Sequence, residues 1–214
     1  MTFPKRLYYN DRNALEGEET MPEFLKKQLI SRYGKAEGEK FFAEAQRRYQ
    51  KLLPLAVRES EGRRKNLLNS VYPFAALYEI LLEHMDRQQA FDEISAIMED
   101  YTRRGNRRFY ETLGKLPFFF PLFRKMFRTG LQGDSWEVSW EADDKHQFAY
   151  NIKSCLWHQA CTELGYPELC RIFCRNDEIN FTDVSRHLYF ERTTTLGSGG
   201  DRCDFHFYPR KPGK

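Results

Sequence analysis

The 214-residue sequence has no long apolar run and no marked excess of one charge. A bilayer-spanning helix needs about 20 consecutive apolar residues, and no window approaches that length. The first residues lead into charged sequence, so we expect no export signal and a cytoplasmic protein. The net charge of +3 is too small to favour a nucleic acid as partner. We therefore expect a small-molecule partner, no nucleic acid and no membrane, with a homodimer as one assembly that the chain could form.

Cysteine is absent from the first 154 residues. All five cysteines lie in the last third of the chain: Cys155, Cys161, Cys170, Cys174 and Cys203. An odd number of cysteines in a chain without an export signal favours free thiols over a disulfide framework. Most other residues suited to acid–base or metal chemistry lie in the same stretch, residues 151–207, so this is where we expect the function.

Helical periodicity dominates the first 130 residues. Residues 1–19 are polar and are expected to wrap loosely before the first helix. Thr20–Glu23 has the pattern of a capping box with proline in the first turn, which predicts a helix from there to Gly34. Apolar residues at helical spacing predict three more helices, at residues 36–53, 66–85 and 89–101.

The segment Leu116–Phe127 interleaves phenylalanines with basic residues. Interfacial membrane helices show this alternation. A short helix packed into the core explains it better, with its phenylalanines in the core or forming the wall of a ligand pocket.

After Gly130 and Gly133 the apolar period changes from helix to strand. Residues 136–141 and 147–152 alternate around a turn, which predicts a hairpin. Two helices follow, at residues 155–164 and 167–176, and then two strands, at residues 188–196 and 203–208. The predicted fold class is α+β: a helical bundle, then a four-stranded antiparallel sheet with two helices (β-β-α-α-β-β) on one face. The helical subdomain would be residues 1–130 and the α+β subdomain residues 131–214, together in one compact unit.

Strand periodicity indicates where several side chains of the last two strands point. Cys203 shares a face with Phe205 and Phe207, whereas Asp204 and His206 share the other face. Arg192 has the parity of the core-facing residues of its strand, so it is expected to point under the helices. A buried guanidinium needs an anion, which Asp177, Glu168 or a substrate carboxylate could provide.

Three chemistries fit the cysteines. A soft metal could be held by Cys155, His158, Cys170 and Cys174, which lie at C-x2-H and C-x3-C spacing on adjacent helices. A thiolate of Cys203 or Cys174 could act as a nucleophile. The third interpretation is structural, with the cysteines as small buried hydrophobic residues, and periodicity alone favours it.

A resemblance favours the second interpretation. The chain carries, in order, Asn151-Ile-x-x-Cys155, Gly165-x-Pro-Glu168-Leu, Cys174-x-x-Asp177, Arg192-Thr-x-Thr-Leu196 and Gly199-Gly200-x-x-Cys203-Asp204-Phe205. This series resembles the L-2-amino-thiazoline-4-carboxylic acid hydrolase-like family of bacterial proteins, and the resemblance covers residues 60–208.

The resemblance implies hydrolysis of a cyclic amidine such as 2-aminothiazoline-4-carboxylate to N-carbamoyl-cysteine, without a metal or other cofactor. Cys203 or Cys174 would be the reactive thiol, Asp177 the general base or amidinium anchor, and Arg192 the carboxylate clamp. The remaining expected substrate-binding residues are Asn151, Asp204, Gly199, Gly200 and Cys155. A non-catalytic module that binds a small ligand or a metal and has a regulatory role is the alternative.

Overall fold

The computed structural model describes residues 19–210 and has the α+β fold. The expected wrapping of residues 1–19 falls almost wholly outside the described residues. The chain divides into two compact units, residues 1–98 and residues 99–214. Of the described residues, no helix is both long and apolar enough to span a bilayer.

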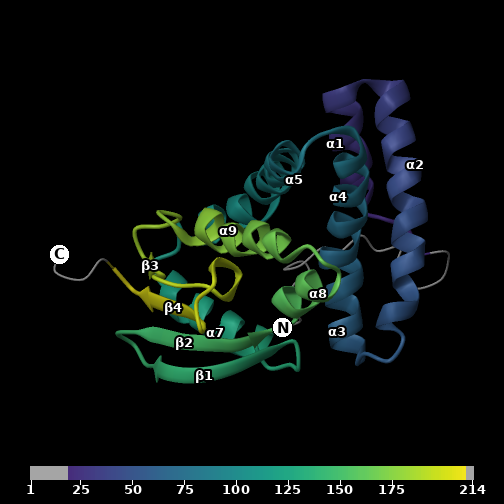
Figure 1. Cartoon of the computed structure of the whole chain (residues 1–214). Coiled ribbons are helices and arrows are strands. Elements are labelled where there is room, and N and C mark those ends of the chain that lie inside the picture. Colours follow the sequence, from purple (N-terminus) through teal and green to yellow (C-terminus); the bar gives the residue numbers. More distant parts are fainter. Residues whose placement is uncertain (1–18, 211–214) are drawn as a thin grey trace. The chain divides into compact units, whose positions relative to one another are not determined.

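The first unit is helical. Its elements are α1 (Glu23–Tyr33), α2 (Lys35–Leu52), the 3-10 turn η1 (Leu53–Ala56), α3 (Glu61–Asn66), the π-helical turn η2 (Leu67–Val71), α4 (Tyr72–His84) and most of α5 (Arg87–Thr102). Helices α1, α2 and α4 lie side by side (Figure 1). Gly38 lets α1 and α2 approach closely, because a Cβ atom at this position would lie 2.5 Å from the backbone nitrogen of Ile30.

The start of α1 differs from the expected capping box. Pro22 occupies the N-cap position, and no side chain caps the helix. The backbone N–H of Met21 instead donates to Oε1 of Gln46 on α2, at 2.8 Å. A tertiary contact with α2 thus replaces the local cap that the sequence predicted.

The second unit contains the sheet. Its elements are the end of α5, the π-helical turn η3 (Arg103–Arg107), α6 (Arg108–Leu113), α7 (Phe119–Gly130), β1 (Trp136–Asp143), β2 (Phe148–Cys155), α8 (Leu156–Glu163), the 3-10 turn η4 (Pro167–Leu169), α9 (Cys170–Phe181), β3 (Tyr189–Glu191), the 3-10 turn η5 (Leu196–Ser198) and β4 (Cys203–Tyr208). The sheet is antiparallel in the order β1-β2-β4-β3. The predicted order β-β-α-α-β-β is confirmed.

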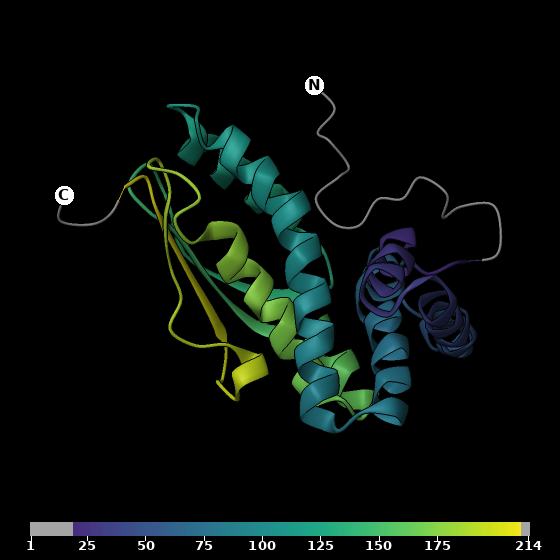
Figure 2. The ribbon, with the colours of Figure 1, turned by 90° about the horizontal axis from the view of Figure 1, so that it is seen from above.

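One face of the sheet is covered by helices. Figures 1 and 2 show α9 running across it. The ring of Phe207 on β4 lies 4.7 Å from that of Phe123 on α7 and 5.4 Å from that of Phe181 on α9. Helix α7 therefore packs on the same face as α9, which is why it belongs to the unit of the sheet.

The third strand is shorter than predicted. The sequence suggested residues 188–196, but β3 covers only Tyr189–Glu191. Beyond it, the backbone N–H groups of Thr193 and Thr194 donate to the carboxylate of Asp204. A side chain of β4 thus takes the hydrogen bonds that a longer ladder would have used.

Candidate functional site

Helix α9 presents Cys170, Cys174 and Asp177 on one face. Their spacing of four and then three residues places them on successive turns. The Sγ atoms of Cys170 and Cys174 are 4.0 Å apart. Of the five free cysteines, Cys174 keeps intermediate exposure and the other four are buried.

Strand β4 and the turn before it complete a cluster of three thiols. Cys203 is a neighbour of Cys174 that contributes to lowering its pKa, and the sulfur of Cys203 accepts the backbone N–H of Leu196 at 3.3 Å. Gly197 closes over the pair on α9, since a Cβ atom there would lie 2.9 Å from Sγ of Cys174. We call Cys170, Cys174 and Cys203 the thiol cluster.

Arg192 lies beside the thiol cluster with only 3% of its side chain exposed. Its Nη1 donates to Oδ2 of Asp177 at 2.9 Å, and its Nη2 donates to the carbonyl of Cys174 at 2.8 Å and to Oε1 of Glu178 at 2.9 Å. Arg192 points under the helices, as expected, and Asp177 is one of its anionic partners. A substrate carboxylate could reach these nitrogens only by displacing a partner.

The thiols of the cluster differ in the direction of their pKa shifts. Hydrogen bonds from Cys170 and Cys203, in that order, lower the pKa of Cys174 against the effect of burial, with further contributions from Arg192 and Thr195. The hydrogen bond to Cys174 raises the pKa of both donors, Cys170 and Cys203, and burial adds to this. Cys174 is therefore the thiol that ionises most readily.

The pKa of Asp177 is raised, whereas that of Cys174 is lowered. Burial raises the pKa of Asp177 to about 7, opposed by the charge of Arg192 and reinforced by that of Cys174. One guanidinium faces three acidic groups here, and 28% of the Asp177 side chain remains exposed. Its Oδ2 atom is bonded to Arg192, and within residues 19–210 its Oδ1 atom has no hydrogen-bond partner.

Asn151 and Asp204 lie on the other face of the sheet. They are directly opposite each other on β2 and β4, one residue out of phase with the pair Ile152 and Cys203. The amide of Asn151 donates to Glu141, and its buried Oδ1 atom has no partner within the described part of the chain. The structure therefore does not bring these two residues to the thiol cluster.

The backbone N–H groups of Gly199 and Gly200 form hydrogen bonds within the turn. The N–H of Gly199 donates to the carbonyl of Leu196 at 3.0 Å, and that of Gly200 to the carbonyl of Thr195 at 2.9 Å. Gly199 has φ +85°, a value that favours glycine. These two glycines shape the turn, and their N–H groups are not available to a ligand.

Cys155 lies at the end of β2, and its sulfur is apart from the hydrogen bonds of the thiol cluster. Burial raises its pKa to about 11, although backbone N–H groups of His158 and Trp157 oppose the shift. Within residues 19–210, no three or more histidine, cysteine, aspartate or glutamate side chains are grouped so that they could hold a metal ion. The tetrad of Cys155, His158, Cys170 and Cys174 is therefore not assembled as a ligand set.

Elements other than α7 cover the thiol cluster. The sequence left open whether the phenylalanines of α7 lie in the core or form the wall of a ligand pocket, and in the structure they contact Phe207, at the opposite end of β4 from Cys203. Helix α9 and η5 lie over Cys203 instead. Sequence reasoning also missed Glu178 as a partner of Arg192 and Thr195 as a neighbour of Cys174. Glu178 follows Asp177 directly in the sequence, and this adjacency was the only sign that it could be a second partner of Arg192.

Fold and site together define an α+β protein with one readily ionised cysteine held by two thiols and a buried arginine. The family model of L-2-amino-thiazoline-4-carboxylic acid hydrolase matches residues 64–207, and the chain belongs to this family. No curated protein and no solved structure matches the chain.

Proposed function

We propose that this protein is a cysteine-dependent hydrolase that opens a small cyclic amidine such as 2-aminothiazoline-4-carboxylate. The name of its family supports the substrate class. The observation that carries the proposal is the convergence of two thiols and the charge of Arg192 on Cys174, the least buried cysteine. The thiolate is the nucleophilic form of cysteine, and this arrangement stabilises it.

In the first step, Sγ of Cys174 bonds to the ring carbon between sulfur and nitrogen, and the bond from that carbon to the ring sulfur breaks. The departing ring thiolate takes a proton from Asp177, whose pKa of about 7 lets it hold a proton near neutrality. The substrate is now joined to Cys174 as an S-linked amidine. Asp177 therefore acts as a general acid in this step.

In the second step, water attacks the same carbon and Cys174 leaves as a thiolate. One water proton goes to the former ring nitrogen, and the other returns to Asp177. The product is N-carbamoyl-cysteine, and one water is consumed. The thiols of Cys170 and Cys203 stabilise the thiolate before attack and after departure.

The roles differ from those that the sequence favoured. Of the two thiols that the sequence left open, we assign the nucleophile to Cys174, because Cys203 is buried and its pKa is raised. Arg192 stabilises anions of the protein, since Asp177, Glu178 and the carbonyl of Cys174 occupy its two terminal nitrogens.

The test is turnover of 2-aminothiazoline-4-carboxylate by purified protein, with the product identified by mass spectrometry and the released thiol measured. Cys174→Ser should lower the rate by roughly a thousandfold or more. Cys161→Ala is the matched control, because Cys161 is fully buried on α8 and should leave the rate nearly unchanged. The proposal fails if the serine variant keeps its rate. It also fails if the wild-type protein binds but does not hydrolyse thiazolines, dihydropyrimidines and small lactams, which would favour the binding module.

A further inference from the structure

Asp204 is a buried carboxylate that has no role in the proposed reaction. It lies on the face of the sheet opposite the thiol cluster, with 5% of its surface exposed. A buried carboxylate without a cation is costly unless hydrogen bonds stabilise it.

The donors to Asp204 all come from the segment that follows β3. Its Oδ1 accepts the N–H of Thr193 at 3.0 Å and that of Thr194 at 2.7 Å. Its Oδ2 accepts the hydroxyl of Thr193 at 2.6 Å and the Thr193 N–H at 3.2 Å. Burial alone would raise the pKa of Asp204, but these donors outweigh it and hold the pKa below its ordinary value.

The segment bound by Asp204 is the one that surrounds Cys174. Residues 192–198 begin with Arg192, which donates to the carbonyl of Cys174. Thr195 contributes to lowering the pKa of Cys174, and its hydroxyl donates to Oγ of Ser198 at 3.0 Å and accepts the N–H of Ser198 at 3.1 Å. Gly197 packs directly on the sulfur of Cys174. Fixing Thr193 and Thr194 therefore fixes the residues on both sides of them in sequence.

We infer that Asp204 is a positioning residue that holds residues 192–198 in the conformation in which Arg192 donates to the carbonyl of Cys174 and Gly197 packs on its sulfur. It acts through the backbone of β4, which places its carboxylate on one face of the sheet and the thiol of Cys203 on the other. Because Cys203 and Asp204 are adjacent, the same strand places one thiol of the cluster and anchors the segment that carries Arg192, Thr195 and Gly197. The inference rests on the proposed role of Cys174, but its test needs no substrate.

The readout is the pKa of the Cys174 thiol, measured from the pH dependence of its alkylation by iodoacetamide, with the modified residue identified by mass spectrometry. The titratable and charged groups that interact with this sulfur are Cys170 on α9, Cys203 on β4 and Arg192, with Asp177 a turn further along α9. Cys155 at the end of β2 and Cys161 on α8 interact with it electrostatically as well. All of them remain in the Asp204→Asn variant. In that variant an amide NH2 group, which is a donor, replaces one carboxylate oxygen that accepts hydrogen bonds from Thr193 and Thr194. The segment therefore loses part of the hydrogen bonding that holds it.

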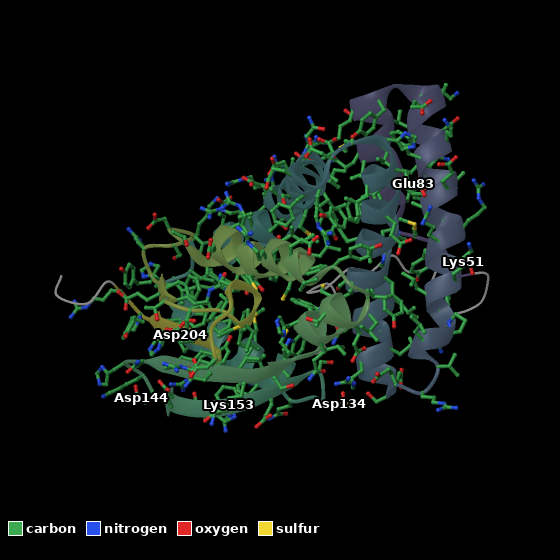
Figure 3. All side chains as sticks on the ribbon, viewed as in Figure 1. Lys51, Glu83, Asp134, Asp144, Lys153 and Asp204 are labelled. Carbon is green, nitrogen blue, oxygen red and sulfur yellow. The ribbon has the colours of Figure 1, made fainter. Side chains whose placement is uncertain are left out.

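Asp204→Asn should raise the thiol pKa by about one unit, because one hydrogen bond to a charged group is worth about that much. Asp144→Asn is the matched control. Asp144 accepts backbone N–H groups from His146 and Gln147, but at the turn of the β1–β2 hairpin. Figure 3 shows it at the end of the hairpin, apart from Asp204. Its variant should leave the thiol pKa unchanged.

A second pair of variants keeps the test decisive if Asp204→Asn fails to fold. Thr193→Val removes one donor to Asp204 and leaves the carboxylate in place, so it should raise the thiol pKa by a smaller amount. Thr193→Ser keeps the hydroxyl and should match the wild-type protein. An unchanged thiol pKa in a folded Asp204→Asn or Thr193→Val variant overturns the inference. Failure of the proposed function would appear separately, as absent hydrolysis with these thiol pKa shifts still present.

Discussion

At the scale of residues, Cys174 and Asp177 lie beside the same guanidinium but their pKa values shift in opposite directions. The neighbouring thiols Cys170 and Cys203 contribute most to lowering the pKa of Cys174, and Arg192 adds to this. Burial raises the pKa of Asp177, although the charge of Arg192 opposes the shift. A nucleophile and an acid with diverging pKa values form the pairing that acid–base chemistry near neutral pH requires.

The raised pKa of Asp177 predicts a loss of stability as the pH rises. In the unfolded chain this carboxyl ionises near pH 4, whereas in the folded protein it ionises near pH 7. Between these values the Asp177 carboxyl binds more protons in the folded state than in the unfolded state, so its contribution to the free energy of unfolding falls with increasing pH and levels off above about 7. The lowered pKa of Cys174 contributes with the opposite sign, so the effect of Asp177 is isolated by comparison with a variant.

Urea denaturation of the wild-type protein and of Asp177→Asn at several pH values between 4 and 8 measures this contribution. The difference in the free energy of unfolding between the two proteins should change in favour of the variant as the pH rises. A difference that is independent of pH would show that Asp177 has an ordinary pKa and would remove its role as the acid.

At the scale of elements, the end of α9 is held from outside the helix. Nη1 of Arg107, on the π-helical turn η3, donates to the carbonyl of Ile179 at 2.6 Å and to that of Thr182 at 2.8 Å. These carbonyls lie at the C-terminal end of α9, where a positive charge is favourable. The turn also follows Thr102, whose hydroxyl donates to Asn176 at 2.8 Å. Both contacts set the position of the helix that carries Cys174.

Arg107→Gln should therefore destabilise the protein by about 1 to 3 kcal/mol, because the two hydrogen bonds from a charged group to the end of α9 are lost together with the ion pair between Arg107 and Glu111. Amide hydrogen exchange should increase most at the end of α9. Arg104→Gln is the control on the same turn. The Arg104 side chain is 73% exposed and forms an ion pair with Asp100 one turn away, so its loss should cost less than about 0.5 kcal/mol. Equal effects of the two variants would mean that the end of α9 does not depend on Arg107.

At the scale of the whole molecule, the five thiols differ in accessibility. None is paired in a disulfide, and four of the five are buried. Titration of freshly purified protein in denaturant should detect all five thiols. In the folded protein one thiol should react rapidly, and peptide mapping should place it at Cys174. A stable disulfide, or rapid labelling of Cys203 in its place, would contradict this distribution.

Periodicity was sufficient to predict the elements that carry the site. The alternation of apolar residues predicted the hairpin and β4, and it placed Cys203 on the covered face, because side chains of a strand alternate strictly. It also predicted that Arg192 is buried, although Arg192 follows the end of β3 and does not lie on the strand. The motifs from Asn151 to Phe205 identified the family, which the match to residues 64–207 confirms.

The sequence by itself determined the order of the elements, the faces of the strands and the family, because each depends on local spacing and residue type. Only the tertiary structure decided which thiol is stabilised, because that depends on Cys203, Arg192 and Cys170 meeting at Cys174 from separate elements. It also ended β3 after Glu191, because the carboxylate of Asp204 takes the N–H groups of Thr193 and Thr194. Spacing along the chain does not reveal which acceptor a backbone N–H will find after folding.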